Sequence, residues 1–267
     1  MNLPTHWFVA SDADMYEKFM ARWSARLAEP FLAFADVKTG QRVLDVGCGT
    51  GTISLALAER GCMVVGMDAS EPYLEGARRR RSHTAITYEL GDAQNLAYPS
   101  GSFDACVSTL AIDVVPEPRK FAAEMRRITR PGGIVACGTF DYWGGFSAAE
   151  NINEIGATFD ENMQVIRDYR RSRPLFWPGG MARLWQDLGL IEVTELPIVI
   201  GFDFESFDDY WTSLCTGPNS MAQRIKVMPG ERRDELRRLV MSSYLAGMED
   251  GARSFASIVR SVRGVVP

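Results

Sequence analysis

A glycine-rich turn near residue 47 restricts the fold of this chain more than any other feature of the sequence. An apolar run at 42–46 leads into Gly47, Gly49 and Gly51, and residues 52–60 then follow a helical pattern. A strand, a glycine turn and a helix in this order are typical of doubly wound parallel sheets, where such a turn contacts a ligand at the carboxyl edge. We therefore predict an α/β, Rossmann-like fold with its ligand site at this turn.

The remaining sequence extends the same pattern. Short apolar runs alternate with helical periodicity up to residue 139, which indicates parallel strands joined by crossover helices. Two more strand patterns follow after long interruptions. A doubly wound sheet of seven strands is expected, at 42–46, 62–68, 85–90, 103–109, 133–140, 191–200 and 254–266.

Aspartates follow three consecutive strands and indicate the kind of ligand. The turn is one residue shorter than the dinucleotide fingerprint, and a carboxylate from Asp45 facing it would repel a pyrophosphate, which argues against NAD. S-adenosylmethionine has a positive sulfonium and a positive ammonium group and no phosphate, so it suits an acidic cleft. We expect Asp68 to accept hydrogen bonds from its ribose. Asp92 and the Ala93 N–H are expected to contact its adenine.

Five motifs strengthen this interpretation. In chain order they are VLDVGCGTG, GMDAS, GDAQNL, FDACVSTLAIDVV and MRRITRPGG. Together they resemble the motifs of class I S-adenosylmethionine-dependent methyltransferases, and most of all the small-molecule branch typified by ubiquinone and menaquinone biosynthesis methyltransferases. The resemblance covers about residues 14 to 139 firmly. It implies S-adenosylmethionine as cofactor, S-adenosylhomocysteine as product, and a last strand that is antiparallel.

The resemblance also implies roles for individual residues. The methionine part of the cofactor is assigned to Asp45, Gly47, Cys48, Gly49 and Gly51, the ribose to Asp68 and Ala69, the adenine to Asp92 and Ala93, and the surroundings of the sulfonium to Thr109 and Leu110. Similar enzymes cover the cofactor with an N-terminal helix. The amphipathic segment at 12–36 fits that role, so Tyr16 and Met20 are expected to touch the cofactor.

A single methyltransferase domain is predicted for 1–267. It comprises the cap helix at 12–36, a cofactor-binding core at 40–140, a lid insertion at 141–178, a return to the core at 179–200, a helical insertion at 201–251 and the last core strand at 252–267. The lid insertion is far longer than the connections usual in α/β folds and is rich in aromatic residues. We expect such a segment to form a substrate wall.

Methyl transfer from a sulfonium requires alignment, exclusion of water and at most a base. The two histidines, His6 and His83, are poorly placed for that role. Better candidates for substrate contacts are Asp113, Tyr142 and Trp143, which follow the fourth and fifth strands. Alternatively, Asp113 caps the next helix and the two aromatic residues form lid core. The aromatic lid favours an apolar or aromatic small-molecule acceptor.

The composition of the chain limits its possible binding partners and its cellular location. The net charge of −5 discourages nucleic-acid binding, and the basic block at 78–81 is interpreted as a solvated helix end. The five cysteines lack C-x-x-C spacing, which predicts neither a disulfide framework nor a metal site. No apolar run of membrane-spanning length and no signal peptide is found, so a cytoplasmic protein without membrane contacts is expected, as monomer or homodimer.

Other functions remain open at this stage. A methyltransferase acting on protein or nucleic acid is one alternative, and a non-catalytic S-adenosylmethionine-binding module is another. A nicotinamide-dependent oxidoreductase is less well supported, because none of the four lysines forms the Tyr-x-x-x-Lys pair of short-chain dehydrogenases. The identity of the methyl acceptor, and whether O, N, C or S is methylated, cannot be predicted from these residues.

Overall fold

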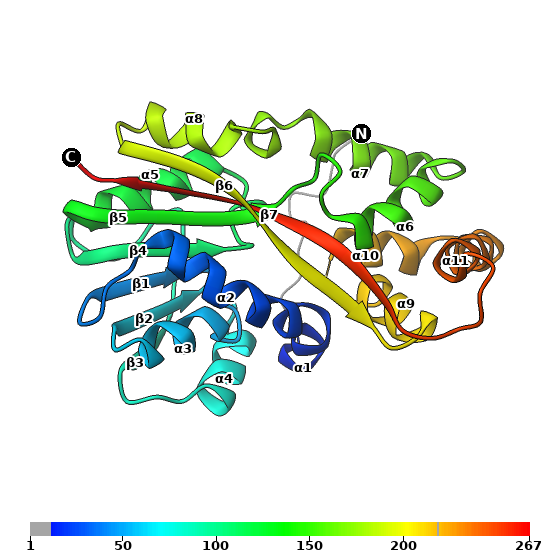
Figure 1. Cartoon of the computed structure of the whole chain (residues 1–267), viewed down its shortest axis with the longest axis horizontal. Helices are drawn as coiled ribbons and strands as arrows, with labels where there is room; N and C mark the ends of the chain where they lie inside the picture. The colour runs from blue at the N-terminus through cyan, green and yellow to red at the C-terminus, as the bar shows by residue number, and fades with distance from the viewer. Residues whose placement is uncertain (1–11, 218) are drawn as a thin grey trace.

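The computed structural model describes residues 12–217 and 219–267. Seven strands form one sheet in the order β3-β2-β1-β4-β5-β7-β6 (Figure 1). The strands are β1 (Arg42–Val46), β2 (Met63–Asp68), β3 (Ile86–Leu90), β4 (Phe103–Thr109), β5 (Thr129–Phe140), β6 (Ile191–Phe204) and β7 (Arg253–Val265). β1 to β5 pair in parallel, and β7 is antiparallel to both of its neighbours. The predicted α/β Rossmann-like fold is confirmed.

Helices cover both faces of the sheet. On one face, Val43 and Val64 pack with Leu57 of α3 (Thr52–Glu59). On the other, Cys106 packs with Phe121 of α5 (Pro118–Ile128) and with α8 (Gly180–Asp187). α4 (Glu71–Arg80) follows β2 and begins at Ser70, whose side chain accepts a hydrogen bond from the Tyr73 N–H at 3.3 Å. Within the described residues, every helix is too short or too polar to cross a bilayer.

The N-terminal helical segment consists of α1 (Ala13–Tyr16), the π-helical turn η1 (Glu17–Ala21) and α2 (Arg22–Ala35). The apolar stripe that predicts an amphipathic helix is buried along its whole length, at Phe19, Trp23, Leu27 and Phe31. The ring of Trp23 stacks on Phe202 of β6 at 4.3 Å between centroids. This contact joins the N-terminal segment to the far end of the sheet.

A helical lobe lies beyond the end of β5 (Figure 1). It contains α6 (Ser147–Ala157), α7 (Glu161–Ser172), the short η2 (Pro174–Phe176), α9 (Phe207–Cys215), α10 (Ser220–Val227) and α11 (Gly230–Leu245). β6 continues to Phe204, four residues past the predicted end of the strand at 200. The reason is that Phe202 and Phe204 alternate into the core in the period of a strand, both being buried.

Candidate active site

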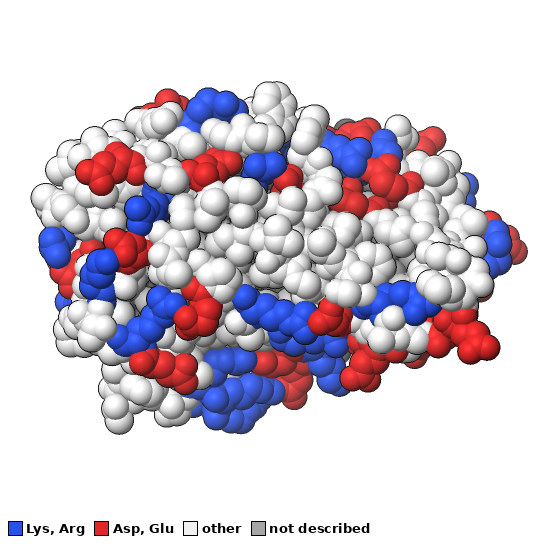
Figure 2. Space-filling view, viewed as in Figure 1, with Lys and Arg blue, Asp and Glu red and all other residues white. Residues whose placement is uncertain are grey.

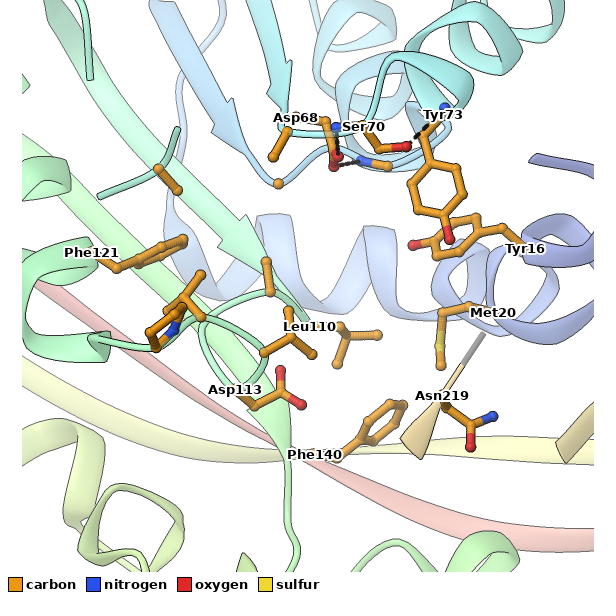
Figure 3. A pocket seen from close by; sticks show the side chains of 18 of the residues that line it. Tyr16, Met20, Asp68, Ser70, Tyr73, Leu110, Asp113, Phe121, Phe140 and Asn219 are labelled. Carbon is orange, nitrogen blue, oxygen red and sulfur yellow. Dashed lines mark hydrogen bonds between the residues drawn. The ribbon is translucent and has the colours of Figure 1, made fainter. Parts of the chain in front are cut away.

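A cavity of about 470 Å³ opens at the carboxyl ends of the parallel strands (Figure 3). Its glycine-loop half is lined by Gly47, Gly49, Asp68, Ala69, Ser70, Tyr73, Gly91, Asp92, Ala93 and Gln94. Its lid half is lined by Asp113, Phe140, Tyr142, Phe146, Tyr169, Arg170, Arg173, Phe176, Leu214 and Met221. Tyr16, Met20 and Leu110 lie between the two halves, so the topology brings most of the expected site residues to one place.

Asp68 ties the glycine loop to the end of β2. Its Oδ2 accepts a hydrogen bond from the Gly49 N–H at 2.8 Å, and its Oδ1 accepts one from the Ser70 N–H at 2.9 Å. Burial nevertheless raises the pKa of the Asp68 carboxyl above its ordinary value, against the effect of these hydrogen bonds. Asp68 is therefore a fixed acceptor inside the cavity.

Gly49 allows the N-terminal helix to approach the loop closely. Its φ is +56°, and a Cβ at this position would lie 2.8 Å from the hydroxyl oxygen of Tyr16. The ring of Tyr16 in turn packs on Tyr73 of α4 at 4.6 Å between centroids. Any larger residue at 49 would push Tyr16 away from the cavity.

Asp45 does not face the cavity, contrary to the prediction. Its carboxylate is buried behind the loop, where Oδ2 accepts a hydrogen bond from Ser54 Oγ at 2.6 Å. Burial, aided by the negative charge of Asp68, raises the pKa of Asp45 to about 7. Cys48, Gly51 and Thr109 are also absent from the cavity lining among the described residues. These four positions shape the loop and strand ends rather than the cavity surface.

Asp92 begins a tight turn after β3. Its Oδ1 accepts a hydrogen bond from the Gln94 N–H at 2.8 Å, and Gln94 Oε1 accepts one from the Glu117 N–H at 2.9 Å. Asp92 and Ala93 both line the cavity. The turn is thus held against the start of α5, and its polar groups face the glycine-loop half.

The basic block at 78–81 holds the N-terminal segment in place. The guanidinium of Arg81 binds the Glu17 carboxylate through two hydrogen bonds, at 2.5 and 3.0 Å, and also donates to the Thr50 carbonyl at 2.9 Å. Arg80 pairs with Asp14. Arg81 is only 16% exposed, so the interpretation of the whole block as a solvated helix end is wrong. Glu17, the carboxylate partner of Arg81, lies 64 residues away in the chain.

Asp113 and Tyr142 form a polar pair in the lid half. The Tyr142 hydroxyl donates to Asp113 Oδ2 at 2.6 Å, whereas Asp113 Oδ1 is buried without a hydrogen-bond partner among the described residues. Burial raises the pKa of Asp113, and the charges of Arg170 and Arg173 oppose that rise. Asp113 does not cap the next helix, because α5 begins after Glu117.

Aromatic rings form the walls of the lid half. Phe140 and Phe146 stack at 4.0 Å between centroids, and Tyr142 meets Phe176 edge-on at 5.0 Å. Trp143, predicted together with Tyr142 as an acceptor contact, lies outside the cavity: it is 54% exposed and packs on Trp177. Both residues lie in the turn that follows β5, and of the two only Tyr142 lines the cavity.

His83 is not part of the cavity lining. His83 is exposed and precedes β3, and His6 lies outside the described residues. No group of side chains suited to a metal ion occurs in the described part of the chain, and the five cysteines are buried free thiols. The titratable groups of the cavity are therefore carboxylates, tyrosines and two arginines.

Part of this chain is similar to known proteins. A family model described as a methyltransferase domain matches residues 44–137. The demethylmenaquinone methyltransferase of Paenarthrobacter aurescens is 43% identical over 107 residues, which make up 40% of this chain and 42% of that protein. The malonyl-[acyl-carrier protein] O-methyltransferase of Serratia marcescens is 32% identical over 135 residues, 51% of this chain and 49% of that protein. The chain thus matches less than half the length of each relative.

A solved structure extends the similarity to the fold of nearly the whole chain. The phosphoethanolamine N-methyltransferase 2 of Haemonchus contortus, in complex with phosphomonomethylethanolamine and S-adenosylhomocysteine, has a TM-score of 0.57 at 20% identity and covers 96% of this chain and 57% of that chain. The resemblance to class I S-adenosylmethionine-dependent methyltransferases is confirmed by these matches.

Proposed function

We propose that this protein transfers a methyl group from S-adenosylmethionine to a small organic acceptor and releases S-adenosylhomocysteine. The relatives named above are methyltransferases, and the family model covers the glycine loop and the strand ends that follow it. The cavity volume of about 470 Å³ lies within the usual range of small-molecule sites, about 300–1,000 Å³.

The charge of the glycine-loop half is the observation that carries this proposal. Asp68 and Asp92 line it, and no lysine or arginine does among the described residues. A pyrophosphate would meet two carboxylates there and no cation, whereas a sulfonium compound is electrostatically suited to the same surface. The residues present therefore fit S-adenosylmethionine better than a dinucleotide.

The positions of the lining residues support the following assignment of roles in cofactor binding. Asp68 would accept the ribose hydroxyls, and Asp92 with the Ala93 N–H would hold the adenine. The backbone of Gly47 and Gly49 would approach the methionine part, while Tyr16 and Met20 would cover it and Leu110 would border the sulfonium. Asp45 supports the loop from behind through Ser54.

When bound, the cofactor supplies an electrophilic methyl carbon and a neutral thioether leaving group. The chain aligns the acceptor by means of the aromatic walls, which also exclude water. The nucleophilic atom of the acceptor would then form the new bond to the methyl carbon, and the electron pair of the carbon–sulfur bond would leave with the thioether sulfur. Asp113 would accept the proton that an O–H or N–H acceptor loses. Its Oδ1, which has no hydrogen-bond partner among the described residues, and the upward shift of its pKa by burial support this role.

A small acceptor is favoured over a macromolecule. The net charge is −5, and on the face shown in Figure 2 acidic and basic side chains lie intermingled along both edges of an uncharged band. Such a surface offers little attraction to nucleic acid. The free cysteines support a reducing compartment such as the cytoplasm. The acceptor atom and the oligomeric state, monomer or homodimer, are open to measurement.

Calorimetry with S-adenosylhomocysteine tests the proposal. Asp68→Ala removes a carboxylate that is expected to bind the ribose, so we expect affinity to fall by about 10- to 100-fold. Asp104→Ala is the matched control, because Asp104 pairs with Arg130 at the other end of the sheet. Equal affinity of wild type and Asp68→Ala would contradict the ribose assignment.

A label-transfer screen then tests the reaction. Methyl-tritiated S-adenosylmethionine is incubated with a library of small organic compounds, and label is followed into an extractable product. Transfer supports the enzyme, whereas binding of S-adenosylhomocysteine without transfer to any compound would favour a non-catalytic binding module.

A further inference from the structure

Two arginines give the lid half a charge opposite to that of the glycine-loop half. Arg170 and Arg173 are the only lysine or arginine side chains among the described residues that line the cavity. Both come from the end of α7 and the residue that follows it, one helical turn apart, so they face the same way. Among the described residues, Asp113 is the only carboxylate that lines the lid half.

Arg173 differs from the other arginines of its helix. Arg167 and Arg171 form ion pairs with Glu154. Arg173 has no carboxylate within ion-pair distance in the described part of the chain, and its Nη1 donates only to the backbone carbonyl of Asp113, at 3.3 Å. A guanidinium has five N–H donors, so most of those on Arg173 are left for a ligand or water.

The rings around Arg173 hold its guanidinium in position. Its Cζ lies 4.8 Å from the centroid of Phe176 and 5.6 Å from that of Tyr169. Arg170 lies over the ring of Tyr142 at 4.8 Å. A guanidinium fixed against an aromatic face loses little conformational freedom when it binds a planar anion through two parallel hydrogen bonds.

From this arrangement we propose that the lid half binds a carboxylate group of the acceptor through Arg173, with Arg170 adding positive charge. The acceptor is then a carboxylic acid with an apolar or aromatic body, which packs against Phe140 and Phe146. This inference rests on the proposed function, in which the acceptor occupies the lid half. It narrows the substrate from small organic molecules in general to one chemical class.

Binding to the protein saturated with S-adenosylhomocysteine tests the inference without a known substrate. The probes are two matched pairs, 2-naphthoate with 2-naphthamide and decanoate with decanamide, measured by calorimetry. We expect at least one carboxylate to bind about 10-fold or more tightly than its neutral amide. Arg173→Met should abolish the preference for the carboxylate. Arg173→Lys should retain part of it, because the positive charge remains but the two parallel N–H donors of the guanidinium are lost.

Arg167→Met is the control, since Arg167 lies on α7 outside the cavity lining, and it should keep the full preference. The inference is overturned if neither carboxylate binds the wild type more tightly than its amide does, or if Arg173→Met still binds the carboxylate more tightly. 2-Naphthyl phosphate binding more tightly than 2-naphthoate would also overturn the carboxylate assignment. If the wild-type protein does not bind S-adenosylhomocysteine, the proposed function is contradicted instead. Failure of the carboxylate inference and failure of the proposed function can therefore be distinguished.

Discussion

At the scale of single residues, two aspartates in the same kind of position have different environments. Asp45 and Asp68 both lie at the carboxyl end of a parallel strand, in β1 and β2. Asp68 faces the cavity and is held by backbone N–H groups, whereas Asp45 is 1% exposed and bonded to Ser54. Sequence position predicts the strand end but not the direction of the side chain, which depends on how α3 packs behind the loop.

The buried Asp45 makes stability depend on pH. Its pKa is raised to about 7 in the folded protein, and an unfolded aspartate titrates near 4, so the folded state binds more protons between these values. The free energy of unfolding therefore falls as pH rises from about 4 to about 7. Asp45→Asn removes this pH-dependent loss, and we expect its stability relative to wild type to increase by on the order of 3–4 kcal/mol across that window.

Urea unfolding of both proteins between pH 4.5 and 7.5 measures the difference. Asp104→Asn is the control: Arg130 and the Arg42 N–H hold the pKa of Asp104 below its ordinary value, so this variant should differ from wild type by a constant amount over the same range. A constant difference for Asp45→Asn as well would show that Asp45 is ionised in the folded protein at all of these pH values.

At the scale of elements, α4 and the N-terminal segment act together. Tyr16 and Met20 reach the cavity from either end of the π-helical turn η1, and Glu17 within that turn is bound by Arg81 at the end of α4. Isolated π-helical turns are often found at functional sites. The ion pair therefore fastens the segment that covers the proposed cofactor.

Breaking this ion pair should speed release of the cofactor product. Arg81→Met removes a partly buried, charge-assisted pair worth about 1–2 kcal/mol, so we expect S-adenosylhomocysteine to dissociate about 5- to 30-fold faster. Glu17→Gln removes the pair from the other side and should act in the same direction. Stopped-flow fluorescence measures the rate.

The matched control is Arg78→Met, because Arg78 pairs with Glu71 on its own helix. Equal acceleration by Arg78→Met and Arg81→Met would mean that α4 was loosened in general and that the N-terminal segment is not fastened by this pair.

The bounds of a strand could be predicted where the local sequence pattern alone determines them. β4 begins and ends at the predicted residues, because an apolar run bounded by turns defines a buried strand. β5 instead begins at Thr129, four residues early, since Pro131 and the two glycines after it suggested a break. Arg81 and Arg173 were missed as site residues because their partners come from segments distant in sequence.

At the scale of the whole molecule, β6 and β7 form a ribbon that joins the sheet to the helical lobe. β5 pairs with β7 only from Val259 to Val265, and the remaining part of β7 pairs with β6 and forms one bridge, between Ser257 and Phe146 (Figure 1). One hydrophobic cluster runs through this ribbon and includes Val43 in the sheet and Leu236 in the lobe. Because the sheet and the helical lobe share this cluster, we predict that they unfold as one cooperative unit rather than as two independent parts.

Thiol labelling tests this cooperativity, because buried cysteines lie in both parts. Cys106 is in β4 and Cys215 is in α9, and both are at most 4% exposed. We expect both thiols to become reactive at the same urea concentration, as read by mass spectrometry of labelled peptides. Phe202→Ala should remove about 3–5 kcal/mol of stability and shift both midpoints together. If Cys215 reacts at a lower urea concentration than Cys106, the lobe unfolds separately, and the lid half can open while the glycine-loop half stays folded.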